Sequence, residues 1–248
     1  MRNLVVSDLH SNWVALRAVI GHVRRKRIDR IVCLGDFVGY GAQPNQVVDA
    51  MRLHRSRKFY VRGNHDRVAV SLAEGLDFNP AARSAALWTR ERLSNPNRRF
   101  LENLPKGPIE RDGVAICHGS PLDEDEYIFT AAHAEETLRS YASKAGVVLH
   151  GHTHLPMIFS VRAEGAVEEI RPDHGQVVKL RKESRHLINP GSVGQPRDRH
   201  PEASCMIFDD DRMTVQCLRV AYDVAAAQAS IVKAGLPKVL ADRLAAGM

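Results

Sequence analysis

Apolar and polar residues alternate with two different patterns in the first third of the chain. Continuous apolar runs at residues 4–6, 31–34 and 59–61 are typical of buried strands. Between them, apolar residues recur at helical spacing, which predicts helices at about 13–25 and from near Pro44 onward. A strand, helix, strand, helix, strand order predicts parallel strands joined by right-handed crossovers, and therefore an α/β protein.

The pattern changes twice further along the chain. Residues 67–104 are helical in pattern, whereas residues 114–117 and 147–149 read as strands on either side of a helix at about 131–143. Beyond Leu155, short strands separated by turns predict an antiparallel meander, and an alanine-rich helical tail covers 224–244 with a break near 235–237. Because no repeat or linker divides the chain, we expect a single domain over 1–248 with a helical insert at about 67–104.

Composition excludes several classes of protein. With 44% hydrophobic and 26% charged residues among 248, the chain is neither disordered, collagenous nor a membrane protein. No apolar run is long enough to span a bilayer, so we expect a cytoplasmic protein with no signal peptide and no membrane partner. The four cysteines lack CxxC spacing and are expected to be buried and unpaired. A net charge of +6 favours an anionic ligand, of which nucleic acid is one class.

Five of the predicted strands are each followed by a short polar motif. Ligands of open α/β sheets bind beyond the carboxyl ends of the strands, so we expect the five motifs to meet in one place. They are Ser7-Asp8-Leu9-His10, Gly35-Asp36, Gly63-Asn64-His65-Asp66, His118-Gly119 and His150-Gly151-His152-Thr153-His154.

Together the motifs hold three aspartates, one asparagine and six of the twelve histidines. Such a mixture of imidazole nitrogen and carboxylate oxygen suits divalent Mn, Fe, Ni or Zn. A single histidine is more often a hydrogen-bonded core residue than a ligand, so the argument rests on the conjunction of the five motifs. His150 is either a support for a neighbouring ligand or a packing residue. The acidic run 123–126 is predicted to be a solvated turn.

In this order and with these neighbours, the five motifs resemble the calcineurin-like metallophosphoesterase superfamily. Residues 35–41 and 189–197 further resemble its small bacterial phosphoesterase branch. The resemblance implies a four-layer α/β/β/α sandwich of two mixed sheets flanked by helices, in which a parallel-rich sheet packs on a second sheet built by the later strands.

The resemblance also implies roles for individual residues. One metal would be held by Asp8, His10, Asp36 and His154, and a second by Asp36, Asn64, His118 and His152, with Asp36 bridging. His65 would be the catalytic residue, contacting the phosphate and protonating or stabilising the leaving oxygen. Two divalent cations, Mn first among them, can clamp a phosphoryl group and activate a water for in-line attack.

One departure bears on the substrate. Protein phosphatases of the superfamily continue their second motif with Asp-Arg-Gly, whereas this chain has Gly39-Tyr40-Gly41. Less fixed positive charge for a phosphomonoester dianion favours a small phosphodiester or nucleotide-like substrate. We expect that substrate to contact Asn64, His65, Tyr40 and Arg197, and the insert following His65 to act either as a lid, through Arg67 or Arg83, or as a structural helical pair.

Alternative functions remain at this stage. The same metal centre serves a dinucleoside polyphosphate pyrophosphatase or a phosphomonoesterase. A non-catalytic interaction module of the same fold is a third reading, which the complete ligand set disfavours.

Overall fold

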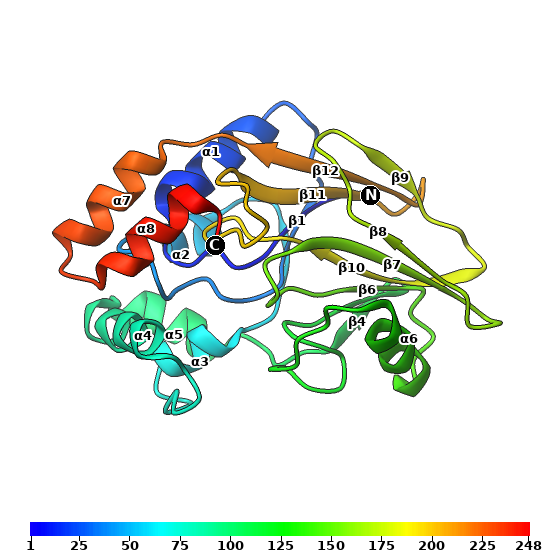
Figure 1. Cartoon of the computed structure of the whole chain (residues 1–248), viewed down its shortest axis with the longest axis horizontal. Helices are drawn as coiled ribbons and strands as arrows, with labels where there is room; N and C mark the ends of the chain where they lie inside the picture. The colour runs from blue at the N-terminus through cyan, green and yellow to red at the C-terminus, as the bar shows by residue number, and fades with distance from the viewer.

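A computed structural model describes all 248 residues as two packed six-stranded sheets with helices outside (Figure 1). The first sheet has the order β3 (Arg57–Tyr60), β2 (Arg30–Cys33), β1 (Arg2–Val6), β11 (Ala203–Asp209), β12 (Thr214–Val220) and β9 (Val177–Lys179). The second has the order β4 (Ile109–Arg111), β5 (Val114–Ile116), β6 (Val147–Leu149), β10 (Ser184–Pro190), β7 (Pro156–Arg162) and β8 (Val167–Ile170). Both sheets mix parallel and antiparallel pairs, and the predicted four-layer sandwich is confirmed.

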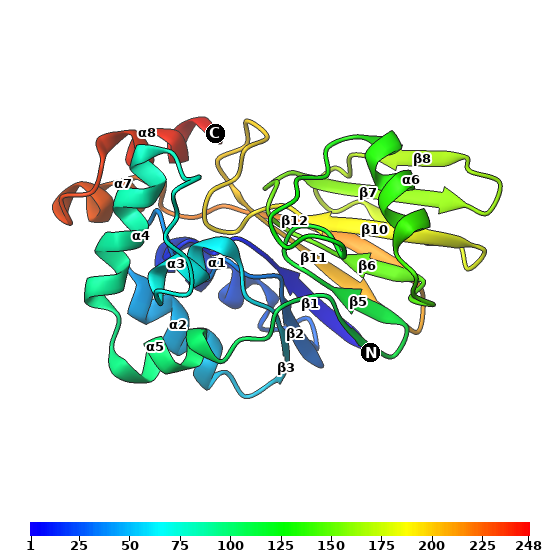
Figure 2. The same ribbon diagram turned by 90° about the horizontal axis from the view of Figure 1, so that it is seen from below.

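Helices cover the outer faces of the two sheets (Figures 1 and 2). Helices α1 (Trp13–Val23) and α2 (Pro44–Leu53) cover the first sheet, and α6 (Ala131–Ser140) covers the second. Helix α3 (Asn64–Ala69) begins within the third motif and is followed by α4 (Pro80–Arg92) and α5 (Asn95–Glu102), which together form the helical segment. The predicted break in the tail separates α7 (Val224–Lys233) from α8 (Lys238–Ala246). None of these helices combines the length and apolar character needed to span a membrane.

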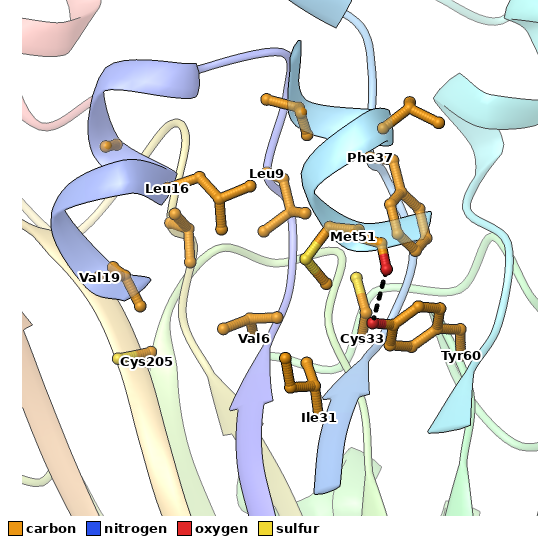
Figure 3. Packing of buried hydrophobic residues seen from close by; sticks show 14 of the residues in the cluster. Val6, Leu9, Leu16, Val19, Ile31, Cys33, Phe37, Met51, Tyr60 and Cys205 are labelled. Atoms are coloured by element: carbon orange, nitrogen blue, oxygen red, sulfur yellow. Dashed lines mark hydrogen bonds between the residues drawn. The ribbon is translucent and has the colours of Figure 1, made fainter. Parts of the chain in front are cut away.

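Burial on both faces explains why the strands read as continuous apolar runs. In β1, Leu4 and Val6 pack under the helices, whereas Val5 lies between the sheets. Figure 3 shows the helix side of this core, where the Tyr60 hydroxyl donates to the Met51 carbonyl at 3.3 Å. Full burial of an aliphatic side chain stabilises a fold by roughly 1.5–3 kcal/mol, so both layers of apolar residues hold the sheets in place.

The distribution of strands between the sheets corrects the sequence-based expectation. β9, β11 and β12 complete the first sheet, whereas the earlier β5 and β6 belong to the second. After β8 the chain passes to the first sheet, returns for β10 and passes back for β11, so a simple meander is wrong. An apolar run reports burial but does not say which strand lies beside it. The short β4 was not predicted, because only Ile109 of its three residues is apolar.

The helical segment is fastened to the end of the chain. Trp88 of α4 donates its indole N–H to the Ala234 carbonyl at 3.2 Å. Ala82 and Ala85 share a buried cluster with Leu240 of α8. The segment therefore lies against the C-terminal helices as well as next to the third motif (Figure 1).

Candidate metal centre

The predicted ligands lie on backbone that is locally strained. Asp8, His10, Asp36, His152 and His154 all have left-handed φ angles, between 45° and 68°. Residues other than glycine rarely adopt this region, and such strain gathers at functional sites, where surrounding contacts impose it. The five motifs do meet in one place, as expected: carboxylate and imidazole atoms from all five lie within 4.8 Å of one another in groups of three, and His65 shares one such group with His10 and Asp36.

The first cluster consists of Asp8, His10 and His154, all buried. Nδ1 of His10 donates to the Val38 carbonyl at 3.1 Å, and Nδ1 of His154 donates to the Gln195 carbonyl at 2.6 Å. These bonds leave Nε2 of each ring free to act as a ligand and orient it. Asp8 Oδ1 lies 3.4 Å from His154 Nε2.

The second cluster consists of Asn64, His118 and His152. Nδ1 of His118 donates to the Leu34 carbonyl at 2.7 Å, while its Nε2 lies 3.2 Å from Asn64 Oδ1. His152 differs, because its Nε2 donates to the Asp125 carbonyl at 3.1 Å and leaves its Nδ1 available to a cation.

Asp36 lies between the two clusters. Its Oδ2 is 3.6 Å from His10 Nε2 and 3.4 Å from His118 Nε2. Its Oδ1 accepts from the backbone N–H of His65 at 2.9 Å, which holds the carboxylate in this orientation. One carboxylate oxygen therefore faces both clusters, as the predicted bridging role requires.

The first cluster fits a cation better than it fits the protein atoms alone. With both Nδ1 atoms donating to carbonyls, the Nε2 atoms of His10 and His154 carry lone pairs, yet they lie 3.1 Å apart. Asp8 Oδ1 is buried and accepts no hydrogen bond. Lone pairs that converge without a donor repel one another, and a divalent transition metal between nitrogen and oxygen ligands removes this repulsion.

Burial and mutual charge shift the pKa values of these groups. Burial raises the pKa of the Asp8 carboxyl to about 7. Burial opposes ionisation of both Asp36 and His118, but their mutual attraction outweighs it, holding the pKa of Asp36 well below its usual range and raising the pKa of His118 to about 10. Cations at this site therefore compete with protons for the same lone pairs.

His65 is held by packing against other rings. The ring centroids of Phe78, Tyr40 and His10 lie 4.4, 4.5 and 4.9 Å from its own. Its Nδ1 is buried without a hydrogen-bond partner, and burial lowers its pKa to about 4. A Cβ added at Gly39, where φ is +90°, would approach this Nδ1 to 2.4 Å. The Gly-Tyr-Gly departure therefore makes room for the histidine instead of supplying a carboxylate partner.

The two further predicted substrate contacts lie beside these rings. Tyr40 is only 6% exposed, and its ring contacts those of His10 and His65. Its hydroxyl accepts from Arg197 Nη2 at 3.3 Å. This placement favours a contact through Arg197 and disfavours stacking of a substrate on Tyr40.

Other side chains, to which the sequence reasoning assigned no role, pin the motif loops together. Asp66 accepts from the backbone N–H of Val38 at 3.2 Å and of Gly63 at 3.0 Å, which joins the second and third motifs. The signal was present, since Asp66 directly follows His65 in the third motif.

Residues 189–197, the segment that resembles the small bacterial phosphoesterase branch, brace the first and fifth motifs. Asn189 donates to the Gly151 carbonyl at 2.6 Å, and the Ser192 hydroxyl donates to the Asp8 carbonyl at 2.8 Å. Ser192 therefore supports the loop that carries Asp8.

The acidic run is only in part the solvated turn that was predicted, since Asp123 is exposed but Glu124 is buried. Glu124 is only 8% exposed and pairs with Arg62 and Arg67 at 3.2 Å, and Arg67 also pairs with Asp125. Arg67 is thereby engaged by this loop, while Phe78 is the side chain of the insert that contacts His65. The paired arginines and carboxylates lie more than 50 residues apart in sequence, so a local sequence pattern could not predict these ion pairs.

Comparison with known proteins agrees with the motifs. Residues 1–213 match the calcineurin-like phosphoesterase superfamily domain. The chain is 36% identical to an uncharacterized protein of Methanocaldococcus jannaschii over 98% of this chain and 97% of that protein. A metallophosphoesterase from Sphaerobacter thermophilus is 39% identical, with a TM-score of 0.87 over 100% of this chain and 99% of that one.

A hypothetical protein from Pyrococcus horikoshii shares the fold at 20% identity, with a TM-score of 0.79 and coverage of 100% of this chain and 98% of that one. The family's fold implies a dinuclear divalent metal centre, which the two buried clusters and the central carboxylate fit. The chain belongs to the calcineurin-like phosphoesterase superfamily.

Proposed function

We propose that the protein is a phosphodiesterase that depends on two divalent cations, manganese first among them, and acts on small diesters or nucleotide-like substrates. The observation that carries the proposal is the position of Asp36 Oδ2 between His10 Nε2 and His118 Nε2, at 3.6 and 3.4 Å. Two clusters that share one carboxylate oxygen are the donor arrangement for a pair of cations.

The side chains around this centre have different roles in the proposed reaction. Two bound cations supply Lewis-acid polarisation of the phosphoryl group and an activated water. Asp36 and the histidines hold their lone pairs in fixed directions, because carbonyls of Val38, Leu34 and Gln195 orient the rings. His65, packed beside His10, is assigned to the leaving oxygen, which it protonates or stabilises by a hydrogen bond.

The surroundings of His65 support a diester in preference to a monoester. The rings that pack on it come from His10, Tyr40 and Phe78, none of which carries a fixed positive charge. Arg67, the nearest arginine in sequence, is paired with Asp125 and Glu124. Arg197, which donates to the Tyr40 hydroxyl at 3.3 Å, is a nearby guanidinium without a carboxylate partner. A monoester dianion has one more charge to neutralise than a diester, so this modest positive charge favours the diester.

A substrate panel tests the proposal. The Mn-loaded protein is assayed on bis(p-nitrophenyl) phosphate, p-nitrophenyl phosphate, a dinucleoside polyphosphate and a phosphopeptide, and kcat/KM is compared. We expect the diester to be preferred. A monoester, phosphopeptide or anhydride preferred tenfold or more over the diester would contradict the proposed substrate class, and no hydrolysis of any of them would favour a non-catalytic member of the fold.

A further inference from the structure

A cleft of about 720 Å³ lies to one side of the metal centre. We call it the side cleft and define it by Phe129, Met157, Pro172, His174, Arg197 and Arg199, which are among its lining residues. Its volume falls within the range of small-molecule sites. The loop after β10, gold in Figure 2, brings Arg197 and Arg199 to it, between the C-terminal helix α8 and the second sheet.

Two lining residues connect the side cleft to the metal centre. The Phe129 ring stacks on Tyr127, with centroids 5.5 Å apart and planes 6° apart, and Tyr127 stacks on His152 at 3.8 Å. Arg197 donates to the hydroxyl of Tyr40, whose ring contacts that of His10. A single side chain therefore separates each of these two lining residues from a predicted metal ligand: Tyr127 lies between Phe129 and His152, and Tyr40 lies between Arg197 and His10.

The walls offer one exposed aromatic face and cations without a carboxylate partner. Phe129 is 50% exposed, and an exposed ring beside a polar cleft is a platform for another π system. Arg219 pairs with Asp198 and Arg171 pairs with Glu169, whereas neither Arg197 nor Arg199 makes an ion pair. Three carboxylates also line the cleft, Asp173, Asp198 and Glu202, and the four arginines outnumber them by one.

We propose that the side cleft binds a nucleotide arm of the substrate, with a base stacked on Phe129 and a second phosphate paired with Arg199. The inference rests on the proposed phosphodiesterase function, because the scissile phosphate must lie at the metal centre while the rest of the molecule lies in the cleft. A guanidinium matches a phosphate in geometry as well as charge, and a base stacks on an aromatic ring whatever its sequence. The substrate is then a diester that carries a nucleoside and a further phosphate.

Three esters that share the same leaving group test this assignment. They are methyl p-nitrophenyl phosphate, thymidine 5′-(p-nitrophenyl phosphate) and the same nucleotide with an added 3′-phosphate. Because p-nitrophenol leaves from each, differences in kcat/KM report the arm alone. We expect kcat/KM to rise by about tenfold with the nucleoside and again with the second phosphate.

Two variants locate the gain. Phe129→Ala should reduce the ratio of kcat/KM between the nucleoside and methyl esters by about tenfold, and Arg199→Gln should reduce the ratio between the esters with and without 3′-phosphate by about tenfold. Arg139→Gln, on the exposed side of α6, is the control and should change neither ratio. Calorimetry with thymidine 3′,5′-bisphosphate should show the same losses in affinity.

The outcomes separate the two proposals. Hydrolysis of all three esters at equal kcat/KM, or ratios that neither variant changes, refutes the side cleft and leaves the phosphodiesterase standing. Failure to hydrolyse any ester refutes the phosphodiesterase. In that case, bisphosphate affinity that falls in both variants but not in Arg139→Gln still supports the cleft as a nucleotide site, and unchanged affinity refutes it.

Discussion

The two ligand clusters are supported in different ways. In the first cluster, both histidines donate Nδ1 to carbonyls of buried residues, Val38 and Gln195. In the second, His118 donates to the buried Leu34 carbonyl, but His152 depends on the carbonyl of Asp125, in a loop that reaches the surface. The first cluster is therefore held by the core, and the second partly by a surface loop.

This difference connects the acidic loop to the metal centre. Salt bridges from Arg62 and Arg67 to Glu124 and Asp125 hold the loop whose carbonyl orients His152. Outer partners of metal ligands tune affinity, so the second cluster should respond to changes in this loop while the first does not. Tyr127, stacked on His152, extends the same loop toward the side cleft.

The largest effect is expected from Asp36→Asn, which breaks both clusters at once. A neutral amide is a poor bridge between cations, so elemental analysis should find both metals reduced, and hydrolysis should fall to background. Asp49→Asn, an exposed carboxylate on α2, is the matched control and should retain metal and activity. Full occupancy of both sites in Asp36→Asn would remove Asp36 from the bridging role.

His65→Ala separates holding the metals from chemistry. The side chain belongs to neither cluster, so both metals should remain, while kcat falls by about 10²–10⁴-fold, the usual contribution of a general acid. Elemental analysis and turnover on the same sample provide the test. Loss of metal from this variant would mean that His65 is a ligand.

Gly39→Ala probes how His65 is positioned. The added Cβ would lie 2.4 Å from His65 Nδ1, so the ring must shift and kcat should fall by about tenfold or more without loss of metal. Gly113→Ala is a close control, because φ is +77° there but no atom lies within 4 Å. An equal fall in kcat in the two variants would show that backbone strain, and not displacement of His65, lowers the activity.

The smallest effect is expected from Arg67→Gln, which bears directly on the difference between the clusters. Loosening the acidic loop should weaken one of the two metal-binding steps by up to about tenfold and leave the other unchanged, in a calorimetric titration of the metal-free protein. Arg139→Gln removes an exposed ion pair elsewhere and should change neither step. Equal weakening of both steps would contradict the asymmetry.

The side chains of the site were predictable because they directly follow the apolar runs that predict strands. Asp8, Asp36 and His118 follow apolar runs, and neighbouring strand ends converge. The supports were not predictable, because the groups that orient His10 and His152 are backbone carbonyls of Val38 and Asp125, which any residue type supplies. Left-handed backbone at His152 and His154 is likewise imposed by tertiary contacts.

The layers of the fold were predictable for a related reason. Alternate burial of Leu4 and Val5 on opposite faces of β1 makes an apolar run, and such runs imply cover on both sides. The exchange of late strands between sheets was not predictable, because Val178 of β9 and Ile188 of β10 are both buried and apolar although they belong to different sheets.

Metal dependence of phosphodiester hydrolysis tests the central claim most directly. The purified protein is analysed for metals, exhaustively chelated, and assayed on bis(p-nitrophenyl) phosphate before and after addition of Mn²⁺. We expect up to two metals per chain, loss of hydrolysis with their removal and recovery with Mn²⁺ or a similar ion, because the proposed ligands are nitrogen and oxygen donors. Full activity after exhaustive chelation would contradict the two-metal account.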